Sequence, residues 1–184
     1  VGKGGLLFDE GESVPGASNV VSRFLRTGYL WDQVRVMGGA YGGFCTFDKN
    51  SGFFSFLSYR DPNLAKTIDV YDACGDALLA TADELEKDPD ALATAIIGAV
   101  GDMDPALSAD QKGWLAFNRW IKRESSEYRQ KYRDEVLGTT AEDFRAFAHR
   151  LKEMKKPSVA VVSSSAAFEA AAEAGKKMEL KQVV

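Results

Sequence analysis

The chain has 184 residues, of which 45% are hydrophobic, and it carries a net charge of −4 at pH 7. A length of this order suits one domain with a substantial core. Because the basic residues are spread along a negatively charged chain, we expect no nucleic-acid partner. No apolar run approaches the ~18 residues of a membrane span, so we expect no membrane contact. We expect no signal or transit peptide. The first residue is Val1 rather than methionine, as in a piece of a longer chain or a processed product.

Three strands are expected in the first third of the chain. Residues 2–8 form a short candidate strand. Residues 41–47 and 52–59 are rich in Phe and Tyr and flank a turn cluster at 48–52. Two such runs around a turn indicate a β-hairpin. The second run is apolar on both faces apart from its serines, which is typical of a central strand in a sheet covered on at least one side.

Helices are expected where N-cap residues precede apolar residues at steps of three and four. Ser18 is the expected N-cap of a helix that runs on toward Trp31 and Val34, and Thr27-Gly28 leaves open whether the helix is continuous there. Further starts are indicated by Asp-Pro pairs and capping boxes at Asp61-Pro62, Asp88-Pro89, Ser108 with Gln111, and Thr140 with Asp143. The longest predicted helix should bury one face, made of Leu64, Ile68, Tyr71, Gly75, Leu78, Ala82 and Leu85. A charged helix near residues 122–135 should turn three residues inward: Tyr128, Tyr132 and Val136.

The C-terminal part is expected to add a strand at 157–163, an alanine-rich helix at 165–174 and a last strand at 178–183. Hairpin strands are antiparallel, and here the strands are separated in sequence from a block of four or five helices. This order predicts an α+β fold, with a mostly antiparallel sheet packed against the helices. Without an internal repeat or a convincing linker, residues 1–184 are interpreted as a single domain.

A glycine-rich stretch at the start of the hairpin is the main candidate site. Gly38, Gly39, Gly42 and Gly43 surround Tyr41, and Arg35 lies six residues before that tyrosine. Arginine offers a permanently charged fork of donors, and a tyrosine hydroxyl can donate to a developing oxyanion. The pair could hold a peptide carbonyl and stabilise a tetrahedral intermediate, while the glycines let an extended peptide run along the strand edge.

Other chemistries are disfavoured by residue type and context. The single histidine, His149, and the two cysteines, Cys45 and Cys74, show no metal-ligand spacing, so we expect no metal site formed by this chain alone. No serine is marked as a nucleophile partner for His149. The glycine stretch lacks the Lys-Ser or Lys-Thr pair of a P-loop. It also has the helix before and the strand after, the reverse of a dinucleotide fingerprint.

Residue chemistry alone leaves a second interpretation of the glycine stretch open. The glycines could simply form a bend or bulge where a strand begins, with Tyr41 packed in the core.

The two cysteines are best explained as small buried apolar residues in a reducing compartment.

Two motifs carry a family resemblance. Residues 29–44 include Gly-Gly-Ala-Tyr-Gly-Gly, and residues 55–63 include Tyr-Arg-Asp-Pro-Asn. With residues 95–102 and Lys112-Gly113, they resemble the C-terminal part of the organellar presequence proteases, single-chain members of the pitrilysin-like, inverted-zincin metallopeptidases. The resemblance covers most of the chain, from Val1 to the strand near Val159.

The resemblance implies a split active site. Such enzymes have four related α+β domains around a chamber, with an inverted zinc motif in the first domain and an arginine and a tyrosine lent by the last. Those two fall on Arg35 and Tyr41. The implied substrates are unstructured peptides such as cleaved targeting presequences, in the mitochondrial matrix or the chloroplast stroma.

This chain lacks the zinc motif and is a small fraction of the expected length. By resemblance it is the last domain only, partnered by the N-terminal catalytic half of the same protein, which holds the zinc. Alone, it is expected to bind no catalytic zinc and to cleave nothing. The alternatives are a non-catalytic peptide-binding or assembly module of the same fold, and a fragment without a function of its own. An inverted zinc motif upstream in the parent gene would separate these alternatives.

Overall fold

The computed structural model describes residues 1–181 and contains a four-stranded sheet in the order β2-β3-β1-β4. Its strands are β1 (Gly2–Leu6), β2 (Gly42–Asp48), β3 (Phe53–Tyr59) and β4 (Lys155–Ala160). All three pairings are antiparallel. The predicted hairpin is confirmed as β2–β3, and β3 lies between β2 and β1, as its two apolar faces predicted.

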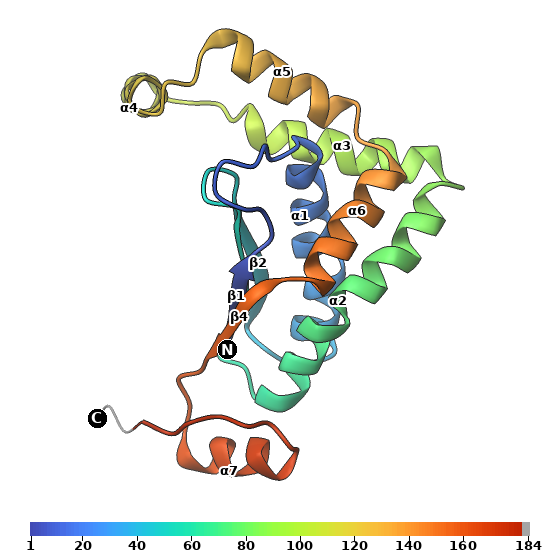
Figure 1. The fold of residues 1–184 in the computed structure, drawn as a ribbon, viewed down its shortest axis with the longest axis vertical. Coiled ribbons are helices and arrows are strands. Elements are labelled where there is room, and N and C mark those ends of the chain that lie inside the picture. The colour runs from blue at the N-terminus through green and yellow to red at the C-terminus, as the bar shows by residue number, and fades with distance from the viewer. Residues whose placement is uncertain (182–184) are drawn as a thin grey trace.

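Helices α1 (Ala17–Thr27), α2 (Leu64–Leu85) and α6 (Ala141–Lys152) lie on one side of this sheet (Figure 1). Cys45 of β2 and Phe54 and Phe56 of β3 point into that layer and are buried. The predicted apolar face of α2 is confirmed, since all seven of its residues are buried. The α+β architecture expected from the element order is therefore present.

The opposite face of the sheet carries no helix in the described part of the chain. Because side chains alternate along a strand, the neighbours of the buried residues point to this side. Phe44 of β2 is 36% exposed, Phe53 of β3 is 45% exposed, and Tyr59 at the end of β3 is 53% exposed. The sheet thus presents an open face with aromatic side chains.

Four further helices complete the fold: α3 (Pro89–Met103), α4 (Ala109–Ile121), α5 (Ser126–Leu137) and α7 (Ser165–Glu173). Helix α7 packs on α2 through a small cluster of Ala171, Leu64 and Ile68. Helix α4 lies apart from the sheet layer (Figure 1) and has no buried residue. Four of its large apolar side chains, here named the α4 stripe, are exposed: Trp114, Phe117, Trp120 and Ile121.

Several predicted helix starts are confirmed. Asp88 accepts a hydrogen bond from the Ala91 N–H, with Pro89 at the first helical position. Capping boxes are present at both predicted places, Ser108 with Gln111 and Thr140 with Asp143.

Two predicted N-caps are wrong. Ser18 lies buried inside the first turn of α1, which begins at Ala17 after Gly16. Helix α2 begins at Leu64 rather than after Asp61, because the Asp61 carboxylate accepts from the Asn63 N–H at 2.9 Å and forms a turn instead.

Three other expectations need correction. The first helix does not run unbroken to Val34: α1 ends at Thr27, Gly28 has non-helical dihedrals, and a separate π-helix then spans Trp31–Val36. Tyr128 is 44% exposed rather than facing inward, and it stacks on Tyr132, which is partly buried against the core. The last predicted strand is not formed over residues 178–181, and its remainder lies outside the described residues.

None of the helices described is both long and apolar enough to span a bilayer.

Candidate functional site

Arg35 lies on a short π-helix, η1 (Trp31–Val36), that leads into the glycine stretch. The Met37 N–H donates to the Asp32 carbonyl at 2.8 Å, five residues back. The chain then reverses, as the Gly39 N–H donates to the Arg35 carbonyl at 3.0 Å and the Ala40 N–H donates to the Val34 carbonyl at 3.2 Å. Single-turn π-helices are frequent at functional sites. Here the reversal places the start of β2 directly against the end of η1.

Three of the four glycines are required by this local fold. Gly39 has φ +76°, which a residue with a side chain rarely adopts. A Cβ on Gly38 would lie 2.5 Å from the Val34 carbonyl oxygen, and one on Gly43 would lie 2.6 Å from the Val34 Cβ. At Gly42 the nearest atom would be on the Phe44 ring, at 3.4 Å. Contact of these glycines with a substrate stays a prediction. Only at Gly42 does packing inside the domain not already explain why the residue is a glycine.

Tyr41 is not a core residue, so the interpretation that buried it is wrong. Its side chain is 67% exposed, directly before the start of β2. Its backbone N–H donates to the Tyr59 carbonyl at 3.1 Å. The Tyr41 and Tyr59 rings meet edge to face with centroids 6.0 Å apart, and the Arg60 guanidinium lies 5.8 Å from the Tyr41 ring and 5.4 Å from the Tyr59 ring. The ring of Tyr41 therefore has neighbours on β3 and at Arg60, while most of the side chain stays accessible to a ligand.

Tyr59 and Arg60 were not predicted as part of this site. Both fall inside the Tyr-Arg-Asp-Pro-Asn motif, but their position beside Tyr41 depends on strand pairing. Arg60 has φ +47°, an unusual conformation for a residue with a side chain. The hairpin register, with Gly42 opposite Tyr59, would have been the signal that places them next to Tyr41.

The Arg35 guanidinium is half-buried and stacks on the Trp31 ring, 3.9 Å from its centroid. This cation–π contact fixes a long, flexible side chain in one direction. The Asn63 side-chain amide donates to the Gly38 carbonyl, which joins the glycine turn to the segment before α2. Arg35 and Tyr41 thus lie on either side of one hydrogen-bonded chain reversal. The ring of Trp31 contacts Arg35, and the ring of Tyr59 contacts Tyr41.

The two cysteines and the histidine lie outside this site. Burial raises the pKa of the Cys45 thiol to about 12, and it also raises the pKa of the Cys74 thiol. The Cys45 S–H donates to the Ser22 carbonyl at 3.3 Å. His149 is exposed on α6. Over residues 1–181, no three His, Cys, Asp or Glu side chains gather closely enough to hold a metal ion, so the residues present do not fit a zinc site.

Comparison with known families and proteins agrees with the resemblance drawn from the motifs. The family model described as the PreP C-terminal domain matches residues 1–166. Presequence protease 1, chloroplastic/mitochondrial, of Arabidopsis thaliana is 45% identical over 166 residues, which cover 90% of this chain and 15% of that protein. Protein HypA of Clostridium perfringens is 33% identical over 156 residues, 85% of this chain and 16% of that protein.

A mitochondrial presequence protease of Aspergillus fumigatus is 33% identical over 132 residues, 72% of this chain and 12% of that protein. The chain therefore spans less than a fifth of the length of these relatives. The names of the plant and fungal relatives place those two proteins in chloroplasts or mitochondria.

Proposed function

The chain belongs to the PreP C-terminal domain family, and on that premise we propose that it is the C-terminal, substrate-binding part of a zinc metalloendopeptidase. The proposed substrates are unstructured peptides such as cleaved organellar targeting presequences. Zinc and the general base are assigned to the N-terminal half of the same protein, since residues 1–181 of this chain do not fit a metal site. The relatives named presequence proteases support the proposal that the full-length protein is a protease.

Arg35 and Tyr41 are the proposed contribution of this chain to the reaction. The observation that carries the proposal is the 67% exposure of the Tyr41 side chain. Tyr41 directly precedes the edge strand β2 and lies close to the end of η1. Its hydroxyl donates a hydrogen bond to the carbonyl oxygen of the scissile peptide as negative charge develops there. The guanidinium of Arg35, braced on Trp31, donates to a neighbouring substrate carbonyl and orients the peptide.

The substrate backbone is proposed to follow β2. This strand is paired only with β3 in the described part of the chain, so alternate backbone groups of its other edge are available to an extended peptide. Gly42 offers no side chain beyond its backbone at the point where the peptide would approach Tyr41. Phe44 and Phe53 on the open face provide apolar contact to substrate side chains.

The α4 stripe is proposed to pack against the remaining part of the same protein. Four neighbouring large apolar side chains on one helix are exposed between 48% and 76%. Exposed apolar patches of this kind mark interaction surfaces. The relatives extend far beyond the segment that this chain matches. The proposed partner of the α4 stripe is therefore the rest of the polypeptide of which this domain is the C-terminal part.

Replacement of Tyr41 in the full-length protein tests the proposed role. Tyr41→Phe removes the hydroxyl alone and should lower kcat by roughly 10²-fold with little change in KM, because a donor used mainly in the transition state is lost. Tyr59→Phe is the matched control, since Tyr59 lies beside Tyr41 and is also exposed. Equal rates for wild type and Tyr41→Phe would remove Tyr41 from the mechanism.

A further inference from the structure

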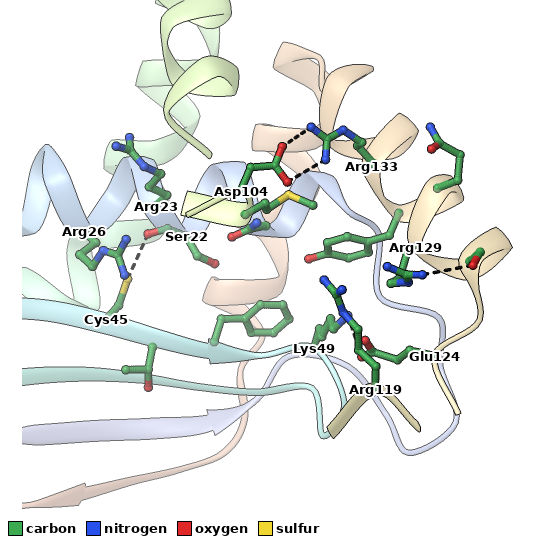
Figure 2. Close-up of a pocket in the computed structure, with 17 residues that line it drawn as sticks. Ser22, Arg23, Arg26, Cys45, Lys49, Asp104, Arg119, Glu124, Arg129 and Arg133 are labelled. Atoms are coloured by element: carbon green, nitrogen blue, oxygen red, sulfur yellow. Dashed lines mark hydrogen bonds and ion pairs between the residues drawn. The ribbon is translucent and has the colours of Figure 1, made fainter. Parts of the chain in front are cut away.

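A second polar site lies at the far end of β2 from Tyr41. A pocket of about 820 Å³ opens between α1, the hairpin turn and the segment from α3 to α5. Figure 2 shows Arg119, Arg129 and Lys49 at one end of this pocket, and Arg23 and Arg26 at the other. Its volume falls within the range of small-molecule sites. The role proposed for Arg35 and Tyr41 makes no use of this pocket.

The pocket is strongly basic in a protein of net charge −4. Two of its lining residues are acidic, Asp104 and Glu124. Six are basic: Arg23, Arg26, Lys49, Arg119, Arg129 and Arg133. A concave surface on which one sign of charge predominates concentrates the electric field and attracts counter-ions.

The carboxylates near the pocket are already used by four of the six cations. Asp104 accepts a hydrogen bond at 3.0 Å from Arg133, which holds the pKa of that carboxyl below its usual range. Glu124 pairs with Lys49 at 3.2 Å. Asp102, just outside the lining, accepts from both arginines of α1, Arg23 at 3.1 Å and Arg26 at 2.9 Å.

Arg119 and Arg129 form no direct ion pair with a carboxylate among the residues that the structure describes, although Glu127 lies within electrostatic range of Arg129. The side chain of Arg129 donates to the Ser126 hydroxyl at 3.1 Å, a neutral acceptor. Arg119 comes from α4 and Arg129 from α5, so the two guanidiniums reach the pocket from different elements. Because neither guanidinium is directly paired with a carboxylate, a bound anion would gain favourable electrostatic interactions with both.

We propose that this pocket binds a compact, multiply charged phosphate anion. A phosphate group presents several acceptor oxygens in different directions, which suits guanidinium forks that arrive from α1, α4 and α5. The Ser22 hydroxyl and the Asn19 amide at the pocket wall add neutral donors. A targeting peptide is a poor ligand here, because such peptides are rich in arginine and poor in acidic residues.

Anion binding would also tie α4 to the body of the domain. The described residues join the segment after α4 to the hairpin by one ion pair, Glu124 with Lys49. A ligand held jointly by Arg119 and the arginines of α1 and α5 would add a bridge that the protein itself lacks. Binding should therefore raise the thermal midpoint of the domain as the free ligand concentration rises.

Titration calorimetry on the 184-residue chain, which has a continuous core of its own, tests the proposal. Sodium triphosphate should bind with a one-to-one stoichiometry at low salt. Arg119→Ala/Arg129→Ala should weaken this binding roughly tenfold or more, because two charge-assisted hydrogen-bond donors are lost. The matched control is Lys112→Ala/Lys131→Ala, which also removes one cation from α4 and one from α5, but outside the pocket lining.

Further arms separate the possible sources of the anion. ATP that binds as tightly as triphosphate identifies the phosphate chain as the recognised group, while tighter ATP binding identifies a nucleotide. Arg119→Lys/Arg129→Lys, which keeps the charges and the fold, should bind with intermediate affinity. The proposal is overturned if triphosphate does not saturate the wild type, if both double alanine variants weaken binding equally, or if a hexaglutamate peptide binds more tightly than triphosphate.

Discussion

Gly43 at the start of β2 lies so close to Val34 of η1 that a Cβ on Gly43 would come within 2.6 Å of the Val34 Cβ. Val34 is completely buried and directly precedes Arg35. The contact therefore fixes the distance between the strand that begins beside Tyr41 and the helical turn that carries Arg35. Packing inside the domain, rather than substrate, explains why a glycine is required at this position.

Gly43→Ala should destabilise the domain and shift η1 away from β2. Overpacking of a tight core contact typically costs about 1–3 kcal/mol. Gly42→Ala is the control, because its Cβ would meet only the Phe44 ring at 3.4 Å and the change should stay within ~0.5 kcal/mol. Urea unfolding of the two variants measures the difference. Equal stabilities would show that η1 adjusts freely, and the positioning role of Gly43 would then be lost.

The chain order of elements was accessible from sequence because each signal was local. The hairpin was marked by two aromatic runs around a turn cluster, and the face of α2 by apolar residues from Leu64 to Leu85. The N-cap at Asp61 was mispredicted because its carboxylate serves a turn at Asn63 in place of a helix end. Local patterns cannot decide between two hydrogen bonds that satisfy the same carboxylate.

The candidate site was only half accessible from sequence. The spacing of Arg35 and Tyr41 was visible, but the exposure of Tyr41 depends on where β2 begins and on its pairing with Tyr59. The stack of Arg35 on Trp31 depends on a π-helix, whose five-residue hydrogen bonds leave no distinct periodic signal. The basic pocket was missed because its arginines come from separate helices and show no cluster along the chain.

Arg35→Ala in the full-length protein should reduce both peptide binding and turnover. The guanidinium is proposed to orient the substrate as well as to stabilise charge, so kcat/KM should fall by roughly 10²-fold and KM should rise. Arg35→Lys keeps the charge but loses the flat stack on Trp31 and should give an intermediate value. Steady-state cleavage of an unstructured fluorogenic peptide measures both variants. Wild-type kinetics for Arg35→Ala would exclude this residue from the site.

The buried thiols should be unreactive in the folded protein. Burial raises the pKa of Cys45 to about 12, and Cys74 is shifted in the same direction, so neither forms appreciable thiolate at pH 8. Ellman's reagent should titrate both thiols in guanidinium chloride and neither in buffer. Rapid reaction of either thiol in buffer would contradict their burial.

The same shifts set a pH dependence of stability. In the unfolded chain each thiol ionises near its ordinary pKa of 9.0, while the folded chain keeps Cys45 protonated up to about pH 12. The folded state therefore binds more protons in this window, and the free energy of unfolding falls as pH rises. The loss should be roughly 1 kcal/mol per thiol between pH 8 and pH 10. Cys45→Ala/Cys74→Ala should show a shallower decline in urea unfolding, and an equal slope would argue against the thiols as its cause.

The α4 stripe should become protected only in the full-length protein. Hydrogen exchange of residues 109–121 should be fast in the 184-residue chain, where α4 has no buried residue, and slower by roughly tenfold or more when the remaining polypeptide covers it.

Trp114→Ser/Trp120→Ser should restore fast exchange of α4 in the full-length protein, because two anchors of the contact are removed. Amides of α6, which buries Phe144 and Phe147, provide the internal control and should exchange slowly in every sample. Identical exchange of α4 in the two wild-type proteins would mean that the rest of the polypeptide does not cover it. Sedimentation of the 184-residue chain over a range of concentrations checks the competing occupant, since reversible dimers that protect α4 would assign the stripe to a second copy of the domain.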